Sequence, residues 1–356
     1  MKSPQFGVLC VLLANLAVLA LPTVSLSAAE PVTNETKPSN VSPASVKGQW
    51  EPIHEGTGGV AVDRSNGDVY LVVTGKEIFK EKSQGIWKSA DRGGTFARVD
   101  GEVIGGRCET AYGLCQDPKG QRMFCFMLDG PSGYTLDGGK TWQKIAKLNR
   151  GWDFAAVDWS VEKPQVLFGF EHESGGKLHL STDGGKSWTK IGENPKDTNG
   201  RTFGVGVVDA HTLVHWSGSA GGVLRSVDLG ATWKMVSEEM PAGHVMTVFN
   251  GVGYWVGSKG LLVSKDKGAT WAWQGQSVPA AWGPYFGKSE KQIVVVGKTG
   301  VYETTDGGET WTLITPLPDL FKNPPGPGWY LNFAFDPVNN VFYTSWMGKP
   351  AFRYLR

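Results

Sequence analysis

One eight-residue pattern occurs six times along the chain and restricts the possible folds more than any other feature. The pattern is Ser/Thr-x-Asp-x-Gly-x-Ser/Thr followed by Trp or Phe, and residues 181–188 are a representative copy. Its aspartates are Asp91, Asp137, Asp183, Asp228, Asp266 and Asp306. They are spaced by 46, 46, 45, 38 and 40 residues, which is the length of a four-stranded propeller blade. The spacing therefore predicts an all-β chain built from repeated four-stranded sheets.

Each copy lies between two short apolar runs, so we expect it to join two antiparallel strands. The Asp carboxylate and the Ser/Thr hydroxyl bond backbone groups within a tight turn, and the Gly supplies a positive φ. The closing Trp, or Phe96 in the first copy, is large enough to fill the wedge between neighbouring sheets. Six calcium or sugar sites are the alternative, but the polar atoms of the pattern are needed within the turn itself. We interpret the turns as structural.

Residues 1–29 have the features of a secretory signal peptide. One basic residue, Lys2, precedes an apolar stretch over residues 6–21, and small residues precede Glu30. An uncleaved membrane anchor is the alternative, but the stretch contains Asn15 and is short for a span of about 20 residues. We therefore predict a secreted or periplasmic protein that does not contact the membrane after cleavage.

Residues 30–46 are rich in Pro, Ser, Thr and Asn and are predicted to be a disordered linker. The linker contains two N-glycosylation patterns, at Asn34 and Asn40, and their use depends on the host. Residues 47–356 are long enough for a single large propeller domain, which we expect to be a monomer.

Composition narrows the set of partners. Lys and Arg number 35 against 34 Asp and Glu, and removal of Lys2 with the signal leaves a net charge of zero. A general polyanion binder carries a basic excess, so we do not expect nucleic acid to be a partner. Three cysteines remain after residue 29, at positions 108, 115 and 125. Cys115 and Cys125 flank a turn, and the sequence leaves open whether they form a disulfide.

The number of blades follows from the chain ends. Six blades contain an Asp turn, and three further strands are expected at residues 330–335, 341–346 and 351–355. The missing outer strand is predicted at residues 48–53, so the N-terminal strand would close the last blade and protect both edges. The sequence therefore predicts a seven-bladed β-propeller, with six blades as the alternative.

The six Asp turns resemble the BNR/Asp-box repeats of the sialidase-type propeller superfamily. This resemblance covers nearly the whole chain after residue 46 and implies a propeller fold. Related groups are sialidases, xyloglucan-active glycosidases, sortilin-type receptors and photosystem II assembly factors. Sialidase chemistry would imply six blades and an Arg-Ile-Pro motif, which this chain lacks. Sortilin-type propellers are longer than this chain. The motif is specific for fold and says little about chemistry.

The candidate site lies on the rim opposite the Asp turns, where loops enter each first strand and leave each second strand. Three arginines open the first strands of consecutive blades and are expected to converge: Arg107, Arg150 and Arg201. Such a cluster would bind a carboxylate or sulfate through paired N–H donors. Aromatic residues on the same loops are expected to contact sugar rings: Trp152, Trp282 and Trp329. Salt bridges between blades are the alternative for the arginines, and capping of the channel is the alternative for the tryptophans.

Candidate catalytic residues depend on the reaction. A glycoside hydrolase would use a pair of carboxylates from the set Glu109, Asp153, Glu171 and Glu173. A polysaccharide lyase would combine neutralising arginines with a base, for which the candidates are His244, His172 and Tyr330. No cofactor or metal is expected. The sequence does not decide whether the protein is an enzyme.

The predicted function is binding of, or action on, an acidic oligosaccharide or polysaccharide at the channel mouth. The alternative is a non-catalytic scaffold resembling the photosystem II assembly factors, which would receive an acidic protein segment on an arginine-lined face. A third hypothesis is a glycosidase acting on a neutral polysaccharide, like the xyloglucan-active group. Those enzymes usually carry two propellers, whereas this chain has room for one.

Overall fold

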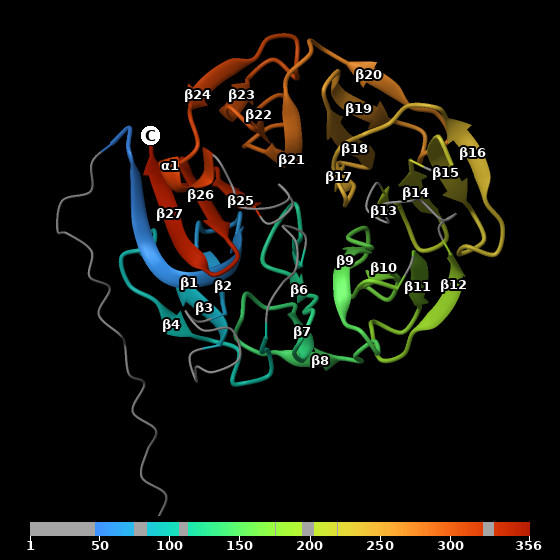
Figure 1. Cartoon of the computed structure of the whole chain (residues 1–356), viewed down its shortest axis with the longest axis horizontal. Helices are drawn as coiled ribbons and strands as arrows, with labels where there is room; N and C mark the ends of the chain where they lie inside the picture. Colours follow the sequence, from blue (N-terminus) through green and yellow to red (C-terminus); the bar gives the residue numbers. More distant parts are fainter. Residues whose placement is uncertain are drawn as a thin grey trace, which may run out of the picture. The chain divides into compact units, whose positions relative to one another are not determined.

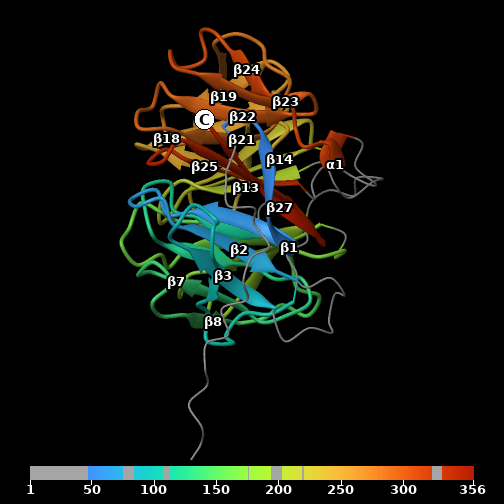
Figure 2. The same ribbon diagram turned by 90° about the vertical axis from the view of Figure 1, so that its left-hand side faces the viewer.

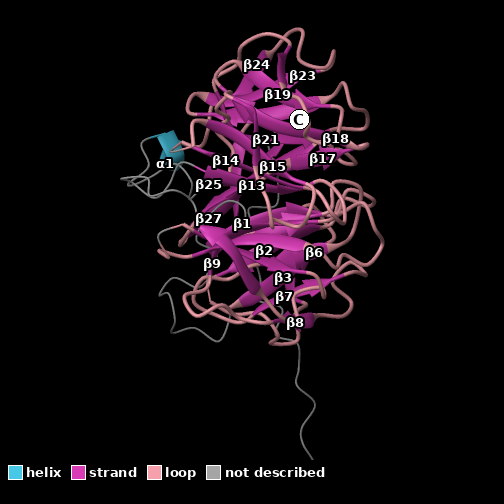
Figure 3. Cartoon of the chain, turned by 90° about the vertical axis from the view of Figure 1, so that its right-hand side faces the viewer, coloured by secondary structure: helices cyan, strands magenta, loops and turns pink. Residues whose placement is uncertain are grey.

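The computed structural model describes residues 47–74, 84–106, 113–174, 176–193, 203–218, 220–322 and 331–356. The chain divides into two compact units, Met1–Glu35 and Thr36–Arg356, and all described residues lie in the second unit. The expected signal peptide, linker and glycosylation patterns lie outside the described residues. In the described ranges the only helix is α1 (Asp319–Lys322), and the remaining regular structure is β-strand (Figure 3). No helix within these ranges is long and apolar enough to cross a membrane.

Five separate four-stranded antiparallel sheets account for most of the second unit. The first contains β5 (Leu114–Gln116), β6 (Met123–Cys125), β7 (Ser132–Thr135) and β8 (Gln143–Ile145). The second contains β9 (Trp152–Val157), β10 (Leu167–Glu171), β11 (Lys177–Ser181) and β12 (Thr189–Glu193). The third contains β13 (Phe203–Val207), β14 (Leu213–Ser217), β15 (Gly222–Ser226) and β16 (Lys234–Ser237). The fourth contains β17 (Thr247–Phe249), β18 (Val252–Gly257), β19 (Gly260–Ser264) and β20 (Ala272–Gln274). The fifth contains β21 (Ala280–Phe286), β22 (Ile293–Gly297), β23 (Gly300–Thr304) and β24 (Thr312–Thr315).

The strands at the two ends of the described chain form a single seven-stranded sheet in the order β25-β26-β27-β1-β2-β3-β4. Its members are β1 (Trp50–Val62), β2 (Val69–Val73), β3 (Gly85–Ser89), β4 (Ala97–Arg98), β25 (Leu331–Asp336), β26 (Val341–Trp346) and β27 (Lys349–Leu355). The first half of β1 pairs with β27 and the second half pairs with β2, both antiparallel. The expected pairing of the N-terminal strand with the last strands is therefore confirmed.

The expected blade count is wrong. The structure has five four-stranded blades, not seven or six, because the remaining strands are continuous in one sheet. The sequence predicted a strand at residues 48–53 that belongs to the last blade alone. Instead, β1 starts at Trp50 and continues to Val62 as one 13-residue strand, which joins the last strands to β2. Its register shifts between Pro52 and His54, between His54 and Thr57, and between Thr57 and Gly59. Such bulges bend and twist a strand without ending it.

The sheets are arranged about a common axis, and the chain returns to its starting point (Figure 1). The innermost strands contact one another in the succession β1, β5, β9, β13, then β17, β21, β25 and β1 again, with a bridge between Val205 and Val245 joining the third and fourth sheets. The long strand β1 lies beside β27, next to the C-terminus (Figures 1 and 2). This arrangement brings the ends of the inner strands together.

The apolar core lies between neighbouring sheets. Central strands such as β2 and β22 are buried along their whole length, which explains their continuous apolar sequences. One cluster joins Phe154, Phe168 and Leu178 of the second sheet to Val205 and Leu213 of the third. The outermost strands are more polar and exposed, as in β24. Stability therefore depends on contacts between adjacent sheets as well as within each sheet.

The Asp turns form closed hydrogen-bond networks. In the turn at Asp183, Ser181 Oγ donates to Asp183 Oδ1 at 2.8 Å and accepts from Gly185 N at 2.8 Å. Ser187 N and Ser187 Oγ donate to the two carboxylate oxygens at 3.0 and 2.6 Å. These bonds lower the pKa of Asp183 to about 2, and the bond from Ser187 Oγ contributes most to the shift. A Cβ on Gly185, whose φ is +88°, would lie 2.8 Å from Ile145 Cγ2, so the turn packs directly on the preceding sheet.

The closing aromatic residues of the turns pack between sheets. Trp233, beside the third sheet, stacks on Phe168 of β10 in the second sheet, with ring centroids 5.9 Å apart. Trp142 packs on a cluster that contains Tyr70 and Ile86 of the seven-stranded sheet. At these turns the expected wedge between neighbouring sheets is confirmed.

Cys115 and Cys125 are buried and are not bonded to each other. In the register of β5 and β6, Cys115 lies opposite Phe124, and Cys125 lies opposite Leu114. Cys115 Sγ donates a hydrogen bond to Ala155 O at 2.8 Å, which fixes it against the neighbouring sheet. Cys108 lies outside the described residues.

Candidate functional site

The pairing of strands in the second sheet defines two opposite rims. The start of β9 lies beside the end of β10, where Trp152 is opposite Glu171. The end of β11 lies beside the start of β10, where Ser181 is opposite Leu167 and begins the Asp183 turn. The loop that enters β9 and the loop that follows β10 therefore share the rim away from the Asp turn. This is the rim on which the sequence predicted the site.

An open cavity of about 310 Å³ lies on this rim, and we call it the loop cavity. Three segments line it, with the residues Leu128, Asp129, Lys147, Asn149, Arg150, His172 and Glu173. Only Leu128 is apolar. Lys147 and Arg150 supply positive charge, Asp129 and Glu173 supply negative charge, and the Asn149 amide both donates and accepts hydrogen bonds. The cavity is therefore suited to a polar ligand that carries hydroxyl groups and an anionic group.

His172 is held in a fixed orientation at the cavity. Its Nδ1 lies 2.6 Å from Asp153 Oδ1, and each side chain is 20% exposed. A carboxylate oxygen can only accept, so Nδ1 donates the hydrogen and Nε2 of the neutral ring carries the lone pair. The Nε2 atom lies 3.8 Å from Oε1 of Glu173, whose side chain is 68% exposed. This arrangement is typical of a histidine that is oriented for proton transfer.

Arg150 links the loop that enters β9 to the loop that follows β10 through hydrogen bonds. Its Nη1 donates to Glu173 O, and its backbone N donates to Glu171 Oε1 at 3.4 Å. Glu173 has a φ of +44°, a left-handed conformation that is uncommon outside glycine. Residues in such conformations are often found at ligand sites. One hydrogen bond to the main chain of Glu173 thus holds the guanidinium of Arg150 at the edge of the loop cavity.

Glu171 lies beneath the cavity. It is 6% exposed, and its Oε2 is 3.5 Å from His179 Nε2 and 3.9 Å from Lys177 Nζ. Burial lowers the pKa of His179, while attraction to Glu171 opposes the shift. Glu171 therefore belongs to a polar layer under the rim and does not line the cavity, although it is one of the carboxylates predicted from the sequence to be catalytic.

The candidate sugar-contacting residues Trp152 and Trp282 are buried, and the candidate base His244 is partly buried. Trp152 is fully buried, and its ring centroid is 4.3 Å from that of Trp188. Trp282 is 8% exposed and belongs to an apolar cluster between sheets. His244 stacks on Phe154 of the second sheet, with centroids 5.0 Å apart. None of these three residues lines the loop cavity.

The sequence-predicted site residues that come together at the rim of the second sheet are Arg150, Asp153, Glu171, His172 and Glu173. Five others lie outside the described residues: Arg107, Glu109, Arg201, Trp329 and Tyr330. Lys147 and Asn149 were missed by the sequence analysis. The only available signal was their position just before β9, in the same entering loop as Arg150.

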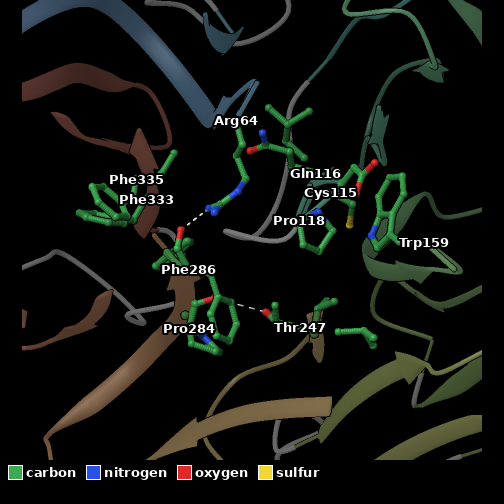
Figure 4. Close-up of a pocket in the computed structure, with 18 of the residues that line it drawn as sticks. Arg64, Cys115, Gln116, Pro118, Trp159, Thr247, Pro284, Phe286, Phe333 and Phe335 are labelled. Atoms are coloured by element: carbon green, nitrogen blue, oxygen red, sulfur yellow. Dashed lines mark hydrogen bonds between the residues drawn. The ribbon is translucent and has the colours of Figure 1, made fainter. Parts of the chain in front are cut away.

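A second cavity, of about 140 Å³, lies between the inner strands (Figure 4). Most of its lining is apolar, as with Phe333 and Phe335, but Arg64 extends across it toward Phe286 (Figure 4). Arg64 Nη1 donates to Phe286 O, and Nη2 donates to Gly287 O at 2.8 Å. Burial lowers the pKa of Arg64 to about 10, and nearby Asp117 and Asp336 oppose that shift.

Arg64 was not singled out by the sequence analysis, because nothing in a turn sequence indicates that one side chain spans the axis. Its contacts join the turn after β1 to the end of β21. We therefore regard this arginine as a structural bridge across the inner strands. In the part of the chain that the structure describes, no three His, Cys, Asp or Glu residues are grouped as metal ligands would be.

The fold and the loop cavity define a class of protein: a β-propeller of four-stranded blades with a polar cavity on the rim away from its Asp turns. No protein-family model and no curated protein matches the chain. Among solved structures, the chain is similar to the GH74 enzyme of Niastella koreensis, at 15% identity over 86% of this chain and 42% of that chain, with a TM-score of 0.54. It is also similar to a chain of the mitotic checkpoint complex, at 11% identity over 96% and 99% of the two chains, with a TM-score of 0.51. A third structure is YCF48 from Cyanidioschyzon merolae, at 14% identity over 86% and 98%, with a TM-score of 0.47.

The chain spans 42% of the length of the GH74 enzyme that it resembles. At these levels of identity, the similarity shows the propeller fold alone. Propellers of one fold carry both enzymes and non-catalytic binding proteins, so the function must be argued from the site.

Proposed function

We propose that this chain is an exported β-propeller that binds an acidic oligosaccharide in the loop cavity. The observation that carries the proposal is the presence of the cations Lys147 and Arg150 around one open cavity of about 310 Å³. The two cations, of which Arg150 is held by its bond to Glu173 O, favour a carboxylate or sulfate, since charge-assisted hydrogen bonds are shorter and stronger than neutral ones. Export to the periplasm or the exterior is part of the proposal and rests on the signal-like sequence of residues 1–29.

The other lining residues suit the rest of a sugar ring. The carboxylates of Asp129 and Glu173 accept hydrogen bonds from hydroxyl groups, and the Asn149 amide exchanges both kinds of bond. The two acids also balance the two cations of the cavity. Attraction to the ligand is therefore local, and we expect it to weaken as salt is added.

An acidic protein segment is the alternative ligand. The buried centres of protein interfaces are enriched in aromatic residues and methionine. The loop cavity has Leu128 as its one apolar lining residue, and Trp152 is buried below the rim. This polar lining favours a glycan over a protein segment.

Calorimetric titration with oligosaccharides of polygalacturonate and chondroitin sulfate, and with neutral dextran, tests the proposal. Arg150→Ala should weaken binding of the acidic glycan by about 1.5–3 kcal/mol, the range for a charged hydrogen bond. Arg150→Lys should recover part of the loss, because lysine lacks the planar pair of donors. Lys144→Ala removes an exposed positive charge from the outer strand β8 of the first sheet and serves as the matched control.

The proposal is refuted if neither acidic glycan binds, or if Arg150→Ala binds normally. Binding of polyglutamate without binding of any glycan would support the protein-segment alternative. Thermal melting of each variant separates loss of binding from loss of folding, since Arg150 also bonds the main chain of Glu173.

A further inference from the structure

His172 combines three features of a general base at the loop cavity. It lines the cavity, and Asp153 Oδ1 lies 2.6 Å from Nδ1 and orients the ring. Asp153 lies on β9, and His172 is the first residue after the adjacent strand β10, so two paired strands support the two residues. Proton transfer needs such a fixed orientation, with the basic nitrogen turned to the substrate.

We propose that the loop cavity cleaves uronic-acid polysaccharides by β-elimination, with His172 as the base and Arg150 and Lys147 as the groups that bind the uronate carboxylate. This inference rests on the proposed function, because the same cavity must first bind an acidic glycan. Asp153 is a positioning residue that acts through His172.

The chemistry requires both parts of the cavity. Arg150 and Lys147 neutralise the carboxylate attached to C5 of the sugar, which makes the C5 proton more acidic and stabilises the charge that develops when it leaves. His172 Nε2 takes this proton, and the electron pair of the C5–H bond forms the C4=C5 double bond. The C4–O bond breaks, and its electron pair goes to the glycosidic oxygen. The imidazolium then returns the proton to that oxygen.

The step is balanced without an oxidant, a reductant or water. Its products are one chain that ends in an unsaturated uronate and one chain that ends in a hydroxyl group. The charged groups around His172 are Asp153 from β9, Lys147 and Arg150 from the entering loop, Asp129 from the segment after β6, and the adjacent Glu173.

Other candidates in the described part of the chain fit this role less well. Glu171 is 6% exposed and contacts His179 beneath the rim. His244 stacks on Phe154 and does not line the loop cavity. Asp153 is directed at His172. The geometry therefore selects the histidine as the group that meets the substrate.

The test uses the full chain with polygalacturonate, alginate and chondroitin sulfate as substrates and dextran as the neutral control. Product formation is followed by the ultraviolet absorbance of the double bond conjugated to the carboxylate. His172→Gln should lower the rate by at least about 100-fold, the usual contribution of a general base. It should retain glycan binding in the calorimeter. The matched control is His211→Gln, an exposed histidine in a turn on the Asp-turn rim, which should keep full activity.

Asp153→Asn tests positioning. It should lower the rate while KM changes little, and it should alter the pH–rate profile, which in the wild type falls as imidazole is protonated at acid pH. This profile also tests the proposal if His172→Gln does not fold. A wild-type rate independent of pH across the range in which imidazole titrates would overturn the role of His172.

The two proposals fail in different ways. Binding of an acidic glycan with no unsaturated product would overturn elimination and leave the binding proposal intact. Absence of binding to every acidic glycan would refute both. Turnover that survives His172→Gln would overturn the assignment of the base.

Discussion

His215 makes folding stability depend on pH in a window that the structure defines. It lies on β14 and is 4% exposed, and its Nδ1 donates to Gly204 O at 3.1 Å. The ring lies edge-on to Trp233, with centroids 6.0 Å apart. Burial lowers the pKa of His215 from 6.5 to about 4, and the bond to Gly204 opposes the shift. In the unfolded chain the ring is solvated and its pKa returns to about 6.5.

The direction of this pH dependence follows from which state, folded or unfolded, binds the proton. Between these two pKa values the unfolded chain takes up a proton that the folded chain excludes, so lowering the pH favours unfolding. The contribution of His215 is fully present above about pH 6.5 and is lost as the pH falls to about 4. One pKa unit corresponds to about 1.4 kcal/mol, so the complete loss is on the order of 3 kcal/mol.

Urea unfolding followed by tryptophan fluorescence at a series of pH values measures this effect. His215→Gln keeps an amide donor near Gly204 but cannot titrate, so most of the pH dependence should disappear. A smaller slope should remain, because burial also lowers the pKa of His179 in the same direction. His211→Gln, at an exposed position four residues earlier, is the control and should leave the slope unchanged. Equal wild-type stability at about pH 7 and pH 4.5, or a variant with the full slope, would refute the reasoning.

Two further changes test the roles of the turns and of the long first strand. Asp183→Ala should lower the free energy of unfolding by about 1–2 kcal/mol and leave glycan binding unchanged, because it removes hydrogen bonds within an exposed turn. Denaturant unfolding measures this loss, with Glu162→Ala at an exposed position as the control. Loss of glycan binding at a normal melting temperature would contradict a structural role for the turn. Ile53→Ala should cost about 2–4 kcal/mol, because Ile53 is 3% exposed in the core of the seven-stranded sheet. The control is Glu55→Ala, at an exposed position on the same strand, which should change the free energy of unfolding little. If Ile53→Ala left the free energy of unfolding unchanged, the first half of β1 would contribute little to the stability of the fold.

Most of the strand architecture could be predicted from local sequence. The Asp turns are recognisable because their side chains bond within the turn itself, as Ser187 does with Asp183. The pairing of the N-terminal strand with the last strands was also predicted, since an unpaired edge needs a partner. The blade count was not predicted correctly, because it depends on whether the first strand bends near Thr57 or ends there. The structure bends there through a register shift.

The site was harder to predict than the fold. Trp152 was correctly expected where the chain enters β9. Its complete burial depends on packing against Trp188, which closes the Asp183 turn. Lys147 and Asn149 lie in a loop that has no periodicity, so the sequence does not show that they share a cavity with His172. The three arginines occupy equivalent positions at the starts of consecutive blades. Such positions alone do not predict that their side chains converge, because loop conformations differ between blades.

The adjacent residues Glu171 and His172 show how the fold supports the site. Glu171 contacts His179 beneath the rim and accepts a bond from the backbone N of Arg150 at 3.4 Å. His172 contacts Asp153 at the cavity. The buried carboxylate thereby positions the loop that carries the arginine, while its neighbour lines the cavity. A site on loops needs such support from regular strands to keep its groups in fixed positions. The polar layer under the rim is thus the structural reason that polar groups from two separate loops remain together at one cavity.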